Sequence, residues 1–561
     1  MRPRLFAFLA ILAMPLFSLA QPLADRVPAD AILYLGWQGS QSLGPTYDQT
    51  HTKAILDASN IPQFFTQTLQ RLTFRVQRDN PQAAQLLQLA TAVGGPLWQH
   101  PSAIFFSGMN YEAAGHPQPK IAIVCRADND ADSLFARFND IAALPGGAAQ
   151  VQAYRLGKDV ALAIGFAPGA NPLAGEGTAL KPIATSDRLT QSLAQVHKNP
   201  VAIAYLDADL LRATLDQALQ QTNDPQAQMY VPKIREALGM TGIKSFICTG
   251  AFEGADWSTQ AFLAAPAPRT GLLTQLDQPA VSEDLLRSIP SSASWLAVAR
   301  FNAAKFLQEL RTAAGKVDPQ AQTVFDQVMG VAQLTLTMNI QKDLFEPLGD
   351  QWALYHDPAA TGAGPLGITL INRLERPEDA QRAFTKLDLF IDNMANARLA
   401  RQKLRLNFEA PRVGDLTVHY VSLPLIAPAW TIKGNNLYVA LYPQVVIAAA
   451  QTPAQAKTIL DNPDYQAIQK RLAVKNPTAV SFIDSSRAVE NSYQKILALS
   501  QLGLGSLDTI GVKTPTLVLP PLNTLRPHLT PAGSASWTDD AGWHHKALHP
   551  FPCLPLLGCL P

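Results

Sequence analysis

A group of residues with binding chemistry follows the first strand-like segment of the sequence. The stretch 36–44 is rich in glycine, and glycine lets a ligand approach the backbone closely. Trp37 offers an aromatic face for stacking, and Tyr47, Asp48 and His51 offer polar groups shortly afterwards. We therefore predict that these four residues bind a ligand. The alternative is a long loop that packs its own tryptophan.

The densest group of histidines is His544, His545 and His549. The surrounding residues read as a strand, so His545 and His549 would share one face while His544 points to the other. No cysteine or carboxylate pattern completes the four-ligand set that a zinc site needs. We predict no metal and no cofactor, with His545 and His549 as the residues to test first. The alternative is a solvated hairpin edge.

Searches for a reaction motif fail. The sequence contains no Gly-x-Ser-x-Gly nucleophile elbow and no Gly-x-x-x-x-Gly-Lys-Ser/Thr phosphate loop. Catalytic residues are therefore left unassigned, and the sequence favours a protein that is not an enzyme.

Several segments recur in the same order, displaced by roughly 250–290 residues, which is the spacing of a duplicated domain. In the second copy, a plain helix entry at Asn302 stands where the first copy has its glycine-rich stretch. The clearest matches are Val27–Leu35 with Ile289–Ala297, Lys198–Asp207 with Lys475–Asp484, and Trp257 with Trp543.

These repeats predict an α+β fold of two tandem homologous domains, with mostly antiparallel sheets and helices packed on them. Hairpin turns such as Gly157-Lys158 imply antiparallel pairing. Asp207 and Asp484 each end a strand before an apolar-periodic helix, so we interpret both as helix caps. The predicted boundaries are residues 1–20 for a signal peptide, 21–280 for the first domain and 281–561 for the second.

The beginning of the sequence predicts export. Arg2 and Arg4 precede an apolar run that ends in small residues at Ala20, which is the pattern of a cleavable signal peptide. The mature protein would then be periplasmic or secreted, with no transmembrane segment. Only four cysteines are present, and Cys553 and Cys559 could close a small loop.

The charge balance argues against nucleic acid as a partner. Lysine and arginine together number 45 and aspartate and glutamate 44, so there is no excess positive charge to bind phosphates. The partner is expected to be an unknown envelope or extracellular molecule.

The segments Val27–Trp37 and Thr52–Ser59 resemble a family of large exported bacterial proteins that is known only as a domain of unknown function. The resemblance implies export and a duplicated α+β fold. It implies no activity, cofactor or site residue.

Three functions follow from these observations. The first is a non-catalytic binding or scaffolding module of the cell envelope. The second is a hydrolase whose site lies in the groove between the halves or in the loop from Trp37 to His51. The third is a carrier of an apolar ligand, suggested by a charged fraction of only 16%.

Overall fold

The structure is a computed structural model of the chain. It describes residues 21–111, 117–144, 151–167, 169–173, 180–222, 224–362, 365–399, 406, 408–451, 456–509, 511 and 517–552. The predicted signal peptide at residues 1–20 and the cysteines at 553 and 559 lie outside these ranges.

The strands fall into two groups along the chain. The first-half strands are β1 (Leu33–Trp37), β2 (Ser102–Asn110), β3 (Gln118–Arg126), β4 (Val151–Leu156), β5 (Asp159–Ile164), β6 (Ala202–Asp207), β7 (Ser245–Glu253) and β8 (Asp256–Ala264). The second-half strands are β9 (Trp295–Arg300), β10 (Gln351–His356), β11 (Ile368–Arg373), β12 (Phe408–Glu409), β13 (Arg412–Val413), β14 (Leu416–Thr417), β15 (His419–Val421), β16 (Ala429–Lys433), β17 (Asn436–Ala440), β18 (Ala479–Ile483), β19 (Ala532–Thr538) and β20 (Gly542–His549).

The helices connect these strands. In the first half they are α2 (Gly44–Asp48), α3 (His51–Ala58), α4 (Ile61–Asp79), α5 (Pro81–Gln99), α6 (Ala131–Ala142), α7 (Asp187–Leu193), α8 (Ala208–Gln221) and α9 (Pro225–Ala237). In the second half they are α10 (Glu283–Leu286), α11 (Ala303–Val317), α12 (Pro319–Leu336), α13 (Pro358–Thr361), α14 (Pro377–Leu399), α15 (Pro443–Ala450), α16 (Pro463–Leu472), α17 (Ser485–Thr509) and α18 (Leu522–Leu525).

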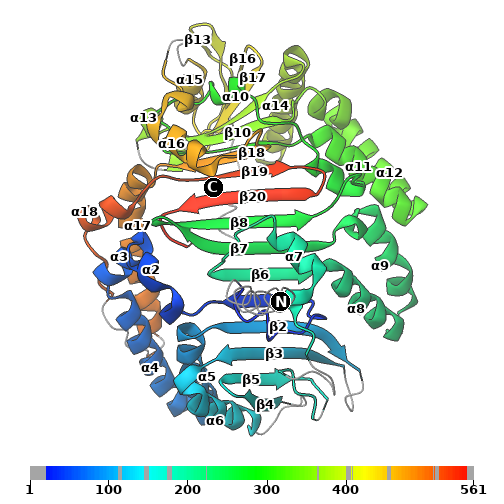
Figure 1. Cartoon of the computed structure of the whole chain (residues 1–561). Coiled ribbons are helices and arrows are strands. Elements are labelled where there is room, and N and C mark those ends of the chain that lie inside the picture. Colours follow the sequence, from blue (N-terminus) through cyan, green and yellow to red (C-terminus); the bar gives the residue numbers. More distant parts are fainter. Residues whose placement is uncertain are drawn as a thin grey trace, which may run out of the picture.

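Eighteen of the strands form one antiparallel sheet, which confirms the α+β class. Figure 1 shows them stacked in a single row, with β4 at the bottom and β16 near the top. From edge to edge the order is β4-β5-β3-β2-β1-β6-β7-β8-β20-β19-β18-β9-β10-β11-β17-β16-β15-β12.

The two halves of this sheet run in the same strand order outward from their junction. In the first half the order is β8, β7, β6, β1, β2, β3, β5, β4, and in the second it is β20, β19, β18, β9, β10, β11, β17, β16. We expected separate sheets, and that part of the prediction is wrong. Strands β8 and β20 pair along their length, from Gly542 opposite Ala264 to His549 opposite Trp257. This pairing satisfies backbone groups that two free edges would leave unpaired.

Side-chain alternation gives the sheet two faces. On one, which we call the core face, Tyr34, Tyr205 and Ile247 are buried in a hydrophobic cluster of the first half. On the same face Leu296 and Phe482 are buried in a cluster of the second half. Each of these clusters draws its residues from one half of the chain, so each half buries its own apolar interior.

The helical groups beside the sheet mix the two halves. Figure 1 shows α2, α3 and α4 with α17 and α18 beside one end of the strands, and α8, α9, α11 and α12 beside the other end. Helix α9 packs on α11, and α3 packs on the short 3₁₀ turn Arg526–His528. Strand pairing and helix packing therefore both join the halves.

Local predictions from the sequence hold at several points. The Asp207 carboxylate accepts hydrogen bonds from the backbone N–H groups of Asp209 and Leu210, and Asp484 accepts one from Arg487. Both aspartates therefore cap helices, as predicted. Gly157 turns between β4 and β5 with a φ of 61°, a conformation that favours glycine.

Among the described helices, none is long and apolar enough to cross a membrane.

Candidate functional site

An apolar cavity of about 660 Å³ lies between the sheet of the first half and helices α2 and α3. It opens on the face of the sheet opposite to the core face, which we call the cavity face. The described walls contain no Asp, Glu, Lys, Arg or His. The cavity is lined by Trp37, Leu43, Tyr47, Thr52, Ile55, Leu56, Trp98, Ala202, Ile203, Ala204, Cys248, Thr249, Gly250, Phe252, Trp257, Thr259, Phe551 and Pro552.

Small side chains on β6 and β7 create the space. Ala202 lies opposite Gly250, and Ala204 lies opposite Cys248, so four small residues form the floor. A side chain at Gly250 would meet the ring of Trp257, because a Cβ there would lie 2.0 Å from Trp257 Cζ2. The glycine thus leaves room for the Trp257 ring beside the neighbouring strand.

Aromatic rings form two of the walls. Trp37 and Trp98 stack with ring centroids 4.7 Å apart and planes 16° apart, and the Trp37 indole N–H donates to the Trp98 carbonyl at 2.8 Å. On the other wall Phe252 lies between Tyr47 and Trp257, with centroid distances of 5.6 and 5.2 Å. Aromatic pairs of this kind supply large apolar contact areas at defined orientations.

The Trp37–Trp98 pair also borders a second hollow of about 330 Å³ over β1 and β2. Leu35 and Ile104, which lie opposite one another, are 38% and 40% exposed there. The apolar surface therefore extends past the tryptophan pair along the cavity face.

The structure separates the four ligand-binding residues that the sequence predicted. Trp37 and Tyr47 line the cavity, whereas Asp48 is exposed and is not part of its lining. His51 turns to a polar cluster at the junction of the halves, with its Nδ1 3.2 Å from Nδ1 of His528. Burial lowers the pKa of His51, and the nearby Asp256 carboxylate opposes that shift.

The glycines of the stretch 36–44 serve packing within the protein at two positions. A Cβ on Gly36 would meet the Tyr34 hydroxyl and the Pro22 carbonyl, and a Cβ on Gly39 would meet the backbone of His100. Gly39 also has a φ of +88°. The close approach that glycine permits here is therefore an approach of other parts of the protein.

The polar cluster beside the cavity braces the two halves. The buried Asp256 carboxylate accepts from the Thr530 hydroxyl at 2.8 Å and pairs with Arg471 at 2.5 Å. His51 Nε2 lies 3.8 Å from the same carboxylate. Asp256 and His51 come from the first half and the other two residues from the second, so this cluster supports a structural role.

The histidines of β20 are divided between the faces, as strand alternation predicted. His544 stacks on Trp537 and lies 3.1 Å from an Asp539 carboxylate oxygen. His545 Nδ1 lies 2.9 Å from the Ser536 hydroxyl, and burial lowers the pKa of His545 to about 4. His549 lies opposite Trp257 across the junction. Among the described residues, no three His, Cys, Asp or Glu side chains converge as metal ligands would.

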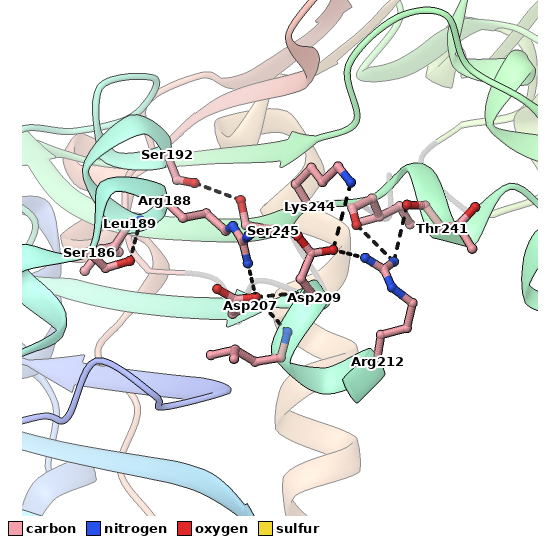
Figure 2. Close-up of polar contacts among 12 residues, drawn as sticks. Ser186, Arg188, Leu189, Ser192, Asp207, Asp209, Arg212, Thr241, Lys244 and Ser245 are labelled. Carbon is pink, nitrogen blue, oxygen red and sulfur yellow. Dashed lines mark hydrogen bonds and ion pairs between the residues drawn. The ribbon is translucent and has the colours of Figure 1, made fainter. Parts of the chain in front are cut away.

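A second polar cluster surrounds the beginning of α8 (Figure 2). Arg188 pairs with both Asp207 and Asp209, while Asp209 also pairs with Arg212. Lys244 approaches Asp209 at 4.0 Å. Each acid of the cluster pairs with at least one base, and Asp207 uses the same carboxylate as a helix cap. We therefore assign this cluster to stability.

Sequence reasoning missed Trp98, Phe252 and Trp257 as cavity residues. Trp257 was recognised only as a marker of the repeat. Strand alternation along the β7–β8 hairpin could have placed Phe252 and Trp257 on one face, since they lie directly opposite each other. Comparisons with protein-family models, curated proteins and solved structures found no match to this chain.

Proposed function

We propose that the chain is an exported, non-catalytic binding protein that takes an uncharged apolar molecule, or the apolar part of a larger one, into the cavity. The observation that carries this proposal is the cavity itself. Its volume of about 660 Å³ falls in the range of about 300–1,000 Å³ that is usual for small-molecule sites. An uncharged lining favours an uncharged ligand, because a buried charge without a partner is costly.

The cavity lining favours binding over hydrolysis. Its hydroxyl and thiol groups belong to Tyr47, Thr52, Cys248, Thr249 and Thr259. A nucleophile of this kind is activated by a base within hydrogen-bond reach. Among the described lining residues there is no histidine or carboxylate to act as that base. The Thr249 hydroxyl has an imidazole within reach, that of His197 at 3.0 Å, but the two groups meet on the core face, on the other side of the sheet from the cavity.

We also propose that the two halves arose by duplication of one α+β unit, and that the protein acts after it has been exported. The common strand order and the matching places of Trp257 and Trp543 in β8 and β20 support the duplication. The basic and apolar residues of the stretch 1–20 support export.

Titration with a neutral fluorescent probe tests the binding function. N-phenyl-1-naphthylamine brightens when it leaves water, and we expect it to bind the chain that begins at Gln21. Trp37→Ala should weaken this binding by about tenfold, which corresponds to about 1.4 kcal/mol of lost contact. Ala204→Phe should abolish binding by filling the floor of the cavity.

The matched control is Trp352→Ala. The Trp352 indole N–H donates to the Phe301 carbonyl at 3.0 Å, much as Trp37 bonds Trp98, but it lies on the second half. Probe binding should be unchanged in this variant. Equal probe affinity in the wild type, Trp37→Ala and Ala204→Phe, with native circular dichroism in all three, would show that the cavity is not the site.

A further inference from the structure

The chain passes over the apolar cavity as it leaves the last strand. Strand β20 ends at His549, and the carbonyl of Pro550 accepts a hydrogen bond from the Thr52 hydroxyl of α3 at 3.4 Å. Phe551 and Pro552, which come next, line the cavity. Phe551 is 37% exposed, so its ring is only partly covered by the described residues.

The residues that follow have the same character as the cavity. The stretch 553–561 lies outside the described residues and reads Cys-Leu-Pro-Leu-Leu-Gly-Cys-Leu-Pro, with four leucines and no charge. Burying one leucine side chain contributes about 1.5–3 kcal/mol. Nine residues can extend over about 30 Å, which is ample to enter a cavity that begins at the preceding residue.

We propose that residues 553–561 insert into the apolar cavity and compete there with the external ligand. The proposal rests on the proposed function, since it treats the same cavity as the ligand site. Attachment at Pro552 keeps the segment at an effective concentration of about millimolar, so weak contacts suffice for occupancy. The apolar composition that fits the segment to the cavity would otherwise be exposed to water.

Such competition regulates binding. A ligand must displace the segment, so its apparent affinity falls in proportion to the fraction of molecules whose cavity is empty. Any partner that holds the segment elsewhere would raise the affinity for the ligand, because binding at two mutually exclusive sites is coupled reciprocally.

Cys248 provides a measure of occupancy that needs no ligand. Its thiol lies on the cavity floor, so a segment in the cavity should shield it from N-ethylmaleimide. In a chain that stops at Pro552, we expect Cys248 to react about tenfold faster, which corresponds to about 1.4 kcal/mol of contact between segment and cavity. Mass spectrometry of the Cys248 peptide measures the rate.

Two controls accompany this measurement. Cys125 lies in a separate cluster with Leu134 and Phe138, and burial raises the pKa of its thiol to about 11, so its reaction should be slow and equal in both chains. A full-length variant with serine at positions 554, 556, 557 and 560 keeps the length of the segment but loses its apolar groups. Its Cys248 should react as fast as in the shortened chain.

The outcomes separate this inference from the proposed function. If Cys248 is shielded in the full chain but N-phenyl-1-naphthylamine does not bind the shortened chain, the insertion holds and the binding function fails. Equal Cys248 rates and equal probe affinities in the two chains overturn the insertion and leave the binding function standing. Shielding that grows with protein concentration also overturns it, because the occupant would then be the segment of a second copy.

Discussion

The cavity faces of the two halves carry different side chains on the same strand framework. In the first half Leu35 and Trp37 of β1 look onto Cys248 and Gly250 of β7 across β6. In the second half the corresponding positions hold Ala297 and Ala299 of β9 and Ser534 and Ser536 of β19, across β18.

The serine hydroxyls of the second half hydrogen-bond to each other or to a histidine. Ser481 and Ser534 hydroxyls lie 2.7 Å apart, and Ser536 lies 2.9 Å from Nδ1 of His545. The first-half position that matches His545 is Thr259, which accepts from the indole N–H of Trp257 at 3.0 Å. One backbone plan therefore supports an apolar, hollow face in one half and a hydrogen-bonded face in the other. The difference lies in side chains and not in topology.

The comparison of the two halves predicts its largest effect on folding stability at acidic pH. Burial lowers the pKa of His197 in the first half and of His545 in the second from 6.5 to about 4. The folded state thus favours the neutral rings, and the unfolded state takes up the protons as the pH falls. Stability is complete above about pH 6.5 and is lost as the pH drops toward 4. By pH 5 each ring should cost about 2 kcal/mol, at about 1.4 kcal/mol per pKa unit.

Urea unfolding at pH 7 and pH 5 measures this loss. His197→Gln and His545→Gln should each remove their own share of the pH dependence, because glutamine does not titrate. His197 bridges Thr249 and Ser258 on the core face. His545 faces Ser481, Ser534 and Ser536, which we call the serine row, so the pair of histidines tests both surfaces. A pH dependence that is the same in both variants as in the wild type would contradict the assignment of these rings as buried and neutral.

The sequence predicted features that are set within a few residues. The caps at Asp207 and Asp484, the turn at Gly157 and the opposite faces of His544 and His545 follow from local patterns. Trp37 and Tyr47 were selected because they lie in or just after the glycine-rich stretch that follows the first strand, and both line the cavity.

The cavity as a whole could not be predicted, since it depends on long-range register. Trp98 reaches Trp37 from before β2, and Trp257 reaches the cavity through β8. His51 was predicted to bind a ligand, and no local pattern could show that His528, 477 residues further along the chain, lies beside it. The single sheet was missed for the same reason, because nothing local to β8 or β20 reveals that each is the other's neighbour.

An exchange between the halves at one floor position should have the next largest effect. Gly250→Ser places the side chain of the matching second-half residue beneath Trp257. The Trp257 ring must then move, and with it the hydrogen bond to Thr259. We expect a loss of about 1–3 kcal/mol in the free energy of unfolding, as for other overpacked sites.

The reverse exchange, Ser536→Gly, is the control for that variant. It removes one hydrogen bond and places a flexible glycine in a strand, but it creates no clash, so the loss should be about 1–2 kcal/mol. Denaturant unfolding of both variants gives the two values. If Gly250→Ser is as stable as the wild type, the Trp257 ring does not need the glycine and the two faces are interchangeable at this position.

The smallest effect is expected in the serine row. Ser534→Ala leaves the Ser481 hydroxyl without its cross-strand partner and should cost about 1 kcal/mol. The double variant Ser481→Ala with Ser534→Ala removes both hydroxyls, so it should recover most of that stability. Denaturant unfolding of the wild type, the two single variants and the double variant gives the coupling energy. A positive coupling means that the second half keeps its polar face because its serines satisfy one another. If the effects simply add, the hydroxyls do not depend on each other, and the contrast between the faces needs another physical cause.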